Sequence, residues 1–414
     1  MMKLLLITGF LVQACAFAQA ANYGISAPIV VSGAAELAHN TGGVDNSTQG
    51  RAGVRATVAP SLLLGAHWFA YSLVDIRSSD YLPYEEHGDE AAIDTRLSQA
   101  YIGYKQDFAH ASLLVKAGRL ASAFGSYPLQ YNDAKTAFIN PPLPYYQPLP
   151  FRPDQRACDL DDLLGQDYGG SVAFHCGGSS TPGYGRLPVT LYGIPGIETQ
   201  ISWKRVDSRA QITNSSPANP QSLLSASQAI QWTTGGGYSF RGGLRAGFSQ
   251  FHGPYLDSSV TPALPPNKRF RDYRASGFGI DSQWSHAAWA AEGEWQFFHF
   301  DLPGFIQSPS QQAAYIQIKR ILSPRYYAAF RSSIERPGGA RDGFGERIAQ
   351  FQDSRQTHEF VFGYWINHLQ LLKMGFQYSG WNAWSYEDDV EPARHELGIQ
   401  LQLVTSFNGL SKSY

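Results

Sequence analysis

The feature that most constrains this chain is a repeated alternation of apolar and polar residues with a period of two. Residues 396–404 read ELGIQLQLV, so the leucine and isoleucine side chains share one face of an extended chain and the glutamines share the other. Successive side chains of a strand point to opposite faces, and this pattern therefore predicts a strand with one apolar and one polar face. The same alternation recurs at residues 197–204, 278–284, 290–297 and 372–379.

The connections between these stretches alternate between short turns and long polar loops. Short turns are expected at residues 59–61, 107–109, 206–208, 240–241, 285–287, 323–324 and 367–368. Long loops are expected at residues 39–49, 75–95, 121–194, 215–226, 253–274, 300–310, 335–353 and 383–393. Short turns at one rim and long loops at the other are typical of an outer-membrane β-barrel with periplasmic turns and extracellular loops.

The predicted fold class is all-β, a single transmembrane antiparallel barrel of about 16 strands over residues 21–414. Because an unpaired sheet edge is costly in lipid, the last strand, near residues 392–407, is expected to pair with the first, near residues 29–39. Aromatic residues near the strand ends, such as Trp203 and Trp284, fit interfacial girdles. A soluble, secreted β-protein that binds carbohydrate through exposed aromatic residues is an alternative with the same alternation.

The N-terminus has the features of a secretory signal peptide, predicted to span residues 1–20. A single Lys3 precedes an apolar stretch, and Ala18-Gln19-Ala20 forms an A-x-A cleavage site. The stretch ending in Cys15 weakly resembles a lipoprotein box, which is the alternative route to export. No later segment approaches the ~18 consecutive apolar residues that a membrane helix needs.

Composition and cysteine content exclude several classes of protein. The net charge of −2 provides no electrostatic basis for binding nucleic acid. Removal of the signal peptide leaves two cysteines, Cys158 and Cys176, which are expected to form a disulfide in an oxidising compartment. Two cysteines are too few soft ligands for a zinc site. No cofactor is expected.

The segment 118–125, GRLASAFG, resembles an element of porin-like outer-membrane proteins, which include the phosphate-selective porin O/P group and uncharacterised relatives. In those proteins a strand leads through a G-[RQ]-[FL]-x-x-x-F-G element into a long extracellular loop. Tyr131-Asn132-Asp133 and Pro141-Pro142 resemble the beginning of that loop in the uncharacterised relatives. The resemblance implies a diffusion channel. It does not carry phosphate selectivity over, because the basic residues that line those channels cannot be matched here one by one.

The polar faces of the predicted strands place charged side chains of both signs toward the lumen. Opposed charges across a pore orient hydrated solutes, and rings of one sign select ions. The alternative for each residue is that it pairs with an opposite charge and only keeps the wall hydrated. A one-residue error in strand register would reverse the two faces. The candidate pore or constriction residues are Arg119, Asp133, Arg152, Arg156, Asp159, Lys204, Arg209, Arg245, Glu292, Glu294, Arg331 and Lys373.

The predicted loop 121–194 is far longer than ordinary connections, which indicates a segment that is either functional or disordered. Six prolines between Pro141 and Pro153 stiffen it, and aromatic residues such as Tyr145 provide groups that can pack. The predicted disulfide would staple it, with a stabilisation of about 3 kcal/mol in the loop-entropy model. We expect the loop to fold over or into the barrel and to narrow the pore. The alternative is an outward-standing knob.

The sequence predicts a passive outer-membrane channel for small hydrophilic solutes or ions. The chain has no G-x-S-x-G, P-loop or H-E-x-x-H motif, so an enzyme is not expected. The acidic cluster at residues 84–90 does not match a calcium loop, and no metal is expected. The alternative function is a surface-exposed barrel for adhesion or ligand capture. The expected surroundings are the lipid and lipopolysaccharide of the bacterial outer membrane, and since porin-like barrels commonly trimerise, a homotrimer is the oligomer to test.

Overall fold

The computed structural model describes the chain in segments. The described residues are 23–42, 46–78, 81, 93–129, 132–146, 153, 156–157, 159–160, 163, 188, 192–214, 230–386, 389–407 and 411–413. The predicted signal peptide, residues 1–20, lies outside them, and so do Arg152, Cys158 and Cys176.

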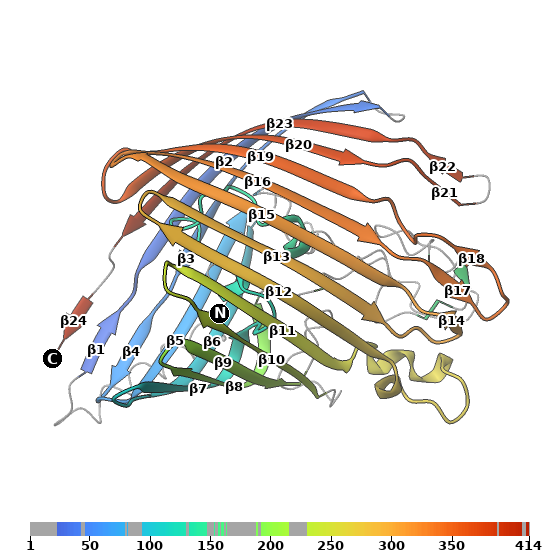
Figure 1. Ribbon diagram of the computed structural model, residues 1–414, viewed down its shortest axis with the longest axis horizontal. Coiled ribbons are helices and arrows are strands. Elements are labelled where there is room, and N and C mark those ends of the chain that lie inside the picture. The colour runs from blue at the N-terminus through green and yellow to red at the C-terminus, as the bar shows by residue number, and fades with distance from the viewer. Residues whose placement is uncertain are drawn as a thin grey trace.

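In the described part of the chain, sixteen long antiparallel strands form a closed barrel (Figure 1). The first eight are β2 (Ile29–Gly42), β3 (Thr48–Val58), β5 (Trp68–Ser78), β6 (Ile93–Asp107), β7 (Ala111–Ala121), β8 (Tyr192–Trp203), β9 (Val206–Thr213) and β10 (Gln231–Ser239). The second eight are β11 (Leu244–Pro254), β12 (Arg274–His286), β13 (Trp289–Phe300), β15 (Ser310–Ser323), β16 (Tyr326–Pro337), β19 (Arg355–Trp365), β20 (Gln370–Trp381) and β23 (Arg394–Phe407). Each strand pairs with the next, and β23 pairs with β2 from Ile29 opposite Phe407 to Gly42 opposite Arg394. The predicted fold class and closure are confirmed.

Short elements extend the barrel at both rims. At the short-turn rim, β1 (Tyr23–Ser26) pairs with β4 (Ser61–Leu64) and with β24 (Ser411–Ser413), so the sheet continues beyond β2, β3 and β23. The long loops contain β14 (Phe305–Gln307), β17 (Ala340–Asp342), β18 (Arg347–Ile348), β21 (Trp384–Tyr386), β22 (Asp389–Glu391), η2 (Tyr127–Leu129), η3 (Leu143–Tyr145), η5 (Ser258–Ala263) and η6 (Phe270–Asp272). Among the described residues no helix is long and apolar enough to cross a membrane.

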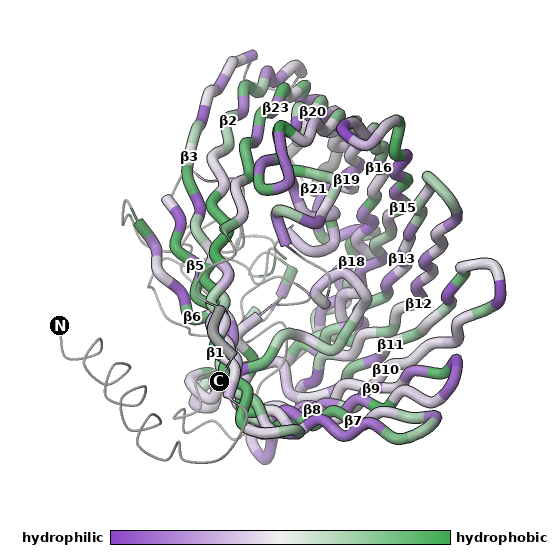
Figure 2. The backbone as a smooth tube through the Cα atoms, turned by 90° about the vertical axis from the view of Figure 1, so that its left-hand side faces the viewer, coloured by the Kyte–Doolittle hydropathy of each residue, from purple (hydrophilic) through white to green (hydrophobic). Residues whose placement is uncertain are grey.

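The barrel wall is apolar outside and polar inside. On β23 the outward-facing Leu397 and Ile399 are more than half exposed, whereas the inward-facing Gln400 and Gln402 are buried. Hydrophilic and hydrophobic positions alternate along the strands that form the ring in Figure 2. The faces predicted from the alternating stretches are therefore right, and the apolar outer wall does not fit the soluble-protein alternative.

Two of the predicted turns are wrong. Residues 59–61 do not end a strand, because β3 and β4 both pair with β5. Pro60 has no N–H to donate, so it interrupts the ladder without ending it, and the hairpin turn follows near Gly65, whose φ is +73°. The turn predicted at 206–208 lies earlier, at Lys204-Arg205, where Lys204 has a φ of +53°. Lys204 is thus an exposed turn residue over the Trp203 ring and not a lumen residue, which corrects its predicted place.

Candidate pore constriction

The long loop after β7 turns into the barrel near Gly125, whereas Gly118 is still paired within the sheet, with Tyr101 and Gly196. Gly118 and Gly125 have φ values of +141° and +73°, a backbone region that favours glycine. A Cβ on Gly125 would overlap the Tyr145 hydroxyl and lie 2.5 Å from Glu294 Oε1 on β13. The residues between the two glycines are mostly buried, and Phe124 is fully so. We call the described residues 122–129 and 132–146 the inner loop.

The first residues of the inner loop bond to side chains of β9 and β11. Gln211 accepts a hydrogen bond from the Ala123 N–H at 3.2 Å and donates to the Ala121 carbonyl at 2.8 Å. Ser249 Oγ accepts from the Gly125 N–H at 2.9 Å, and Arg209 donates to the Gly125 carbonyl. These wall side chains replace the ladder partners that the chain loses when it leaves the sheet.

The Glu294 carboxylate, on the inner face of β13, faces the inner loop. Tyr145 Oη donates to Glu294 Oε2 at 2.7 Å and accepts from Gln296 Nε2 at 2.6 Å. The Ser126 N–H and Oγ both donate to the same carboxylate oxygen at 3.4 Å. The Phe124 ring packs in the same region against the rings of Phe251 and Phe298 on the wall, with centroids 5.0 and 5.6 Å away. Glu294 therefore serves as a docking point for the loop.

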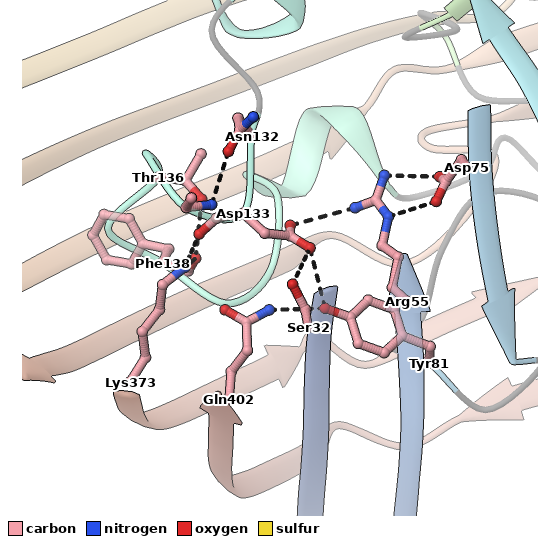
Figure 3. A network of polar contacts seen from close by, with 11 residues as sticks. Ser32, Arg55, Asp75, Tyr81, Asn132, Asp133, Thr136, Phe138, Lys373 and Gln402 are labelled. Carbon is pink, nitrogen blue, oxygen red and sulfur yellow. Dashed lines mark hydrogen bonds and ion pairs between the residues drawn. The ribbon is translucent and has the colours of Figure 1, made fainter. Parts of the chain in front are cut away.

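Asp133 forms a second docking point, at the part of the wall that includes Ser32 and Arg55 (Figure 3). Its carboxylate accepts from Ser32 Oγ at 2.9 Å, from Arg55 Nη1 at 3.3 Å and from Tyr81 Oη at 3.3 Å. The other edge of the Arg55 guanidinium donates to both oxygens of Asp75 at 2.8 Å. The inner loop thus inserts one carboxylate into a network built from β2, β3 and β5.

Two buried cations of the wall bond to backbone carbonyls of the inner loop. Lys373 Nζ on β20 donates to the carbonyls of Asp133 at 2.8 Å and Phe138 at 3.1 Å. Arg331 Nη2 on β16 donates to the carbonyls of Asn140 at 2.7 Å and Pro141 at 3.1 Å. Hydrogen bonds from charged donors are stronger than neutral ones, and here they satisfy carbonyls that are out of water. Both side chains hold the loop against the wall.

The contacts of the inner loop reach around the barrel, from β9, β11 and β13 through β16 and β20 to β2 and β3. The described part of the loop is therefore inside the barrel. Among the predicted site residues, the structure brings Asp133, Arg209, Glu294, Arg331 and Lys373 together at this loop. Arg209, Glu294, Arg331 and Lys373 point inward from the wall and bind the loop, whereas Asp133 belongs to the loop and points at the wall, so none of the five stands free in the lumen.

The other predicted site residues lie elsewhere. Arg156 donates to the Ala263 carbonyl of the β11–β12 loop, and the Asp159 carbonyl accepts from the Leu163 N–H. Arg119 is half-buried near the end of β7, beside Gly193. On the wall, Arg245 pairs with Asp207 at 2.7 Å and Asp281 at 2.6 Å, and Glu292 accepts from Gln317.

The sequence pattern missed inward-facing residues on β5, β6 and β7, although the alternating stretch 197–204 already placed Glu198 of β8 on the inward face. Lys116 pairs with Glu198 at 3.2 Å, and its ammonium lies 5.6 Å from the centroid of the Tyr101 ring. The Tyr71 ring lies 5.2 Å from the Tyr101 ring. Lys116 was missed because Leu114 interrupts the polar residues on the inward face of the stretch ASLLVKA, so its alternation is weak.

Alkaline pH is expected to loosen the inner loop. Burial raises the pKa of Tyr145, and it raises the pKa of Tyr146 to about 12. Unfolded tyrosines ionise near pH 10, so the stabilisation is complete below about pH 10 and is lost as the pH rises through the folded pKa. The urea midpoint should fall between about pH 10 and 12, and it should fall less in the variant Tyr145→Phe/Tyr146→Phe. Equal slopes for the two proteins would contradict this assignment.

No protein-family model and no curated protein matches this chain. It is similar in structure to the outer membrane channel DcaP of Acinetobacter baumannii, with a TM-score of 0.54, 8% identity and coverage of 93% of this chain and 97% of that one. The anion-selective porin from Comamonas acidovorans matches with a TM-score of 0.54 and 10% identity, over 92% of this chain and 100% of that one. OprB of Pseudomonas putida matches with a TM-score of 0.53 and 12% identity, over 93% of this chain and 94% of that one.

These similarities define the class of fold. A closed 16-strand barrel with a polar inner wall is the fold of the outer-membrane porins. At this level of identity the likeness extends to the fold alone. The resemblance to the phosphate-selective porin O/P group stays a prediction.

Proposed function

We propose that this chain is a passive channel of the bacterial outer membrane for small hydrophilic solutes or ions. The observation that carries the proposal is the inner loop, which is docked inside a closed polar barrel by a buried hydrogen bond to Glu294 and by buried hydrogen bonds from Arg331 and Lys373. A loop fixed against the inner wall narrows the cross-section of the channel, and the rest of the inner wall stays in contact with water.

The remaining wall carries charges of both signs. Lys116 and Arg245 face inward with part of their surface exposed, and each is paired with a carboxylate. Asp207, the partner of Arg245, also keeps part of its surface exposed. Because paired charges of both signs line the path, we propose a hydrated path with weak ion preference, suited to polar solutes. Catalysis has no part in this proposal.

Conductance across a planar lipid bilayer tests the proposal. Purified, heat-modifiable protein should insert in discrete steps, each with a conductance that rises with the salt concentration, and reversal potentials in a KCl gradient should show only a weak preference. The heat-denatured protein is the control. Folded protein that inserts without conducting would contradict the channel and favour the adhesion or ligand-capture alternative. The homotrimer stays a prediction, which cross-linking in the membrane can test.

A further inference from the structure

Outward-facing histidines mark one level of the barrel near the long-loop rim. They lie on the outer faces of five strands close to the ends that lead into long loops: His39 on β2, His252 on β11, His299 on β13, His358 on β19 and His395 on β23. Below them on the same faces lie exposed apolar side chains such as Leu397 and Phe360. Amphipathic rings at the edge of an apolar band are typical of a membrane–water interface.

At this level, one sector of the barrel carries a concentration of positive charge. Lys268, Arg269, Arg271 and Arg274 are all exposed, and we call these four residues the basic rim. Arg274 begins β12 opposite Pro254, the last residue of β11, and η6, which contains Arg271, lies against β11. The four cations therefore cluster around the outer ends of β11 and β12.

The nearby carboxylates do not neutralise the basic rim. Asp272 accepts from the Arg269 backbone N–H at 2.9 Å, and Asp301 accepts from the Arg274 backbone N–H at 3.3 Å. Within the described residues, no carboxylate forms an ion pair with any of the four cationic side chains. The arginines inside the barrel differ, since Arg55, Arg245 and Arg331 are each paired with a carboxylate. The positive charge of the basic rim is thus available to an external anion.

The apolar surface beside the basic rim indicates what kind of anion fits. His252 bonds to Ser276 at 2.8 Å and to the Arg274 guanidinium at 2.9 Å, and its ring lies 6.0 Å from that of Trp232. Trp232 and Phe278 face outward and are about 40% exposed. A cation that adjoins an exposed aromatic surface on the outside of a membrane barrel can contact the headgroup and the acyl chains of one lipid.

We propose that the basic rim binds the phosphate groups of the outer-leaflet glycolipid, lipopolysaccharide, with the acyl chains along Trp232 and Phe278. Guanidinium groups match phosphate oxygens with paired hydrogen bonds, which gives the site its chemistry. A soluble acidic partner would use the cations but leave the apolar surface without a role. The inference rests on the outer-membrane placement proposed above. It does not depend on conduction.

Binding of lipid A to the purified full chain in a neutral detergent tests this site. The variant Arg271→Gln/Arg274→Gln should lower the affinity for diphosphorylated lipid A at least about tenfold, because each cation near an anionic lipid surface adds to binding. The matched control is Arg320→Gln/Arg325→Gln, which removes the same charge at the short-turn rim, where Arg320 lies over the Trp289 ring. This control should bind as the wild type does, and both variants should keep the heat-modifiable band.

Two further arms separate the sources of phosphate. Wild type and Arg271→Gln/Arg274→Gln should bind dephosphorylated lipid A with equal affinity. Inorganic phosphate at the same concentration as the lipid should not displace diphosphorylated lipid A from the wild type. Equal affinities of wild type and Arg271→Gln/Arg274→Gln for diphosphorylated lipid A, an equal loss in the control, or displacement of the lipid by inorganic phosphate would each overturn the assignment. Because the readout is lipid binding, a negative result leaves the channel proposal standing, and a non-conducting protein that binds lipid A leaves this site standing.

Discussion

Replacing Arg331 with methionine is expected to raise the single-channel conductance several-fold and to destabilise the docked loop strongly. Arg331 is fully buried and donates to Glu359 Oε2 at 2.5 Å as well as to the Asn140 and Pro141 carbonyls. Its removal leaves a buried carboxylate and two buried carbonyls without their donor. Breaking a buried ion pair from one side typically costs about 3–5 kcal/mol. The least costly response is for the loop to leave the wall and admit water, which widens the path.

Two other variants show whether the effect belongs to the loop. Lys373→Met also removes a buried cation, but its hydrogen-bond acceptors in the loop are two neutral carbonyls, so the expected cost is about 1–3 kcal/mol for each carbonyl left unsatisfied. Arg245→Met breaks pairs with Asp207 and Asp281, none of them in the inner loop. The increase in single-channel conductance over the wild type should be smallest for Arg245→Met, larger for Lys373→Met and largest for Arg331→Met. A rise in Arg245→Met equal to that in Arg331→Met would show that the inner loop does not set the conductance.

The wall of the barrel could be predicted from the sequence because its information is local. A period of two places Glu294 and Gln296 inside and Trp295 outside without knowledge of any distant residue. Closure could also be predicted, since a membrane sheet cannot leave an edge, and the observed pairing of Ile29 with Phe407 lies at the predicted ends. The error at residues 59–61 occurred because proline has two uses. Pro60 interrupts a ladder as readily as it marks a turn.

The sequence predicted a loop that folds over or into the barrel, but the contacts that dock it could not be predicted, because they join residues far apart in the sequence. Lys373 contacts a carbonyl 240 positions away, and Arg331 contacts one 191 positions away. Both acceptors are backbone carbonyls, which every residue has. No side-chain pattern in the loop sequence can therefore predict which carbonyls accept these hydrogen bonds. The sequence placed these cations on the correct face of their strands. It left open whether their side chains line the channel or bind a loop inside the barrel. The structure assigns them to the loop.

Gly125 should tolerate substitution far less than another glycine of the same conformation. Gly65 has the same φ of +73°, but a Cβ there meets nothing within 4 Å. The variant Gly65→Ala therefore bears only the backbone penalty of an L-residue in this region, about 1–2 kcal/mol. In Gly125→Ala the new methyl group must also displace the Tyr145 hydroxyl from Glu294. Losing a hydrogen bond to a charged group adds about 1.5–3 kcal/mol.

The difference between the two alanine variants isolates the contact between the inner loop and the wall. We expect Gly125→Ala to lower the unfolding free energy by about 2 kcal/mol or more beyond Gly65→Ala, and to raise the channel conductance, whereas Gly65→Ala leaves the conductance unchanged. Urea unfolding in detergent and planar-bilayer recording measure the two effects. Tyr145→Phe supplies the cross-check: it removes the hydroxyl that clashes, so Gly125→Ala should cost less in that background than in the wild type. An equal cost in both backgrounds would mean that Gly125 is required only for its backbone conformation, and not for the contact between the Tyr145 hydroxyl and Glu294.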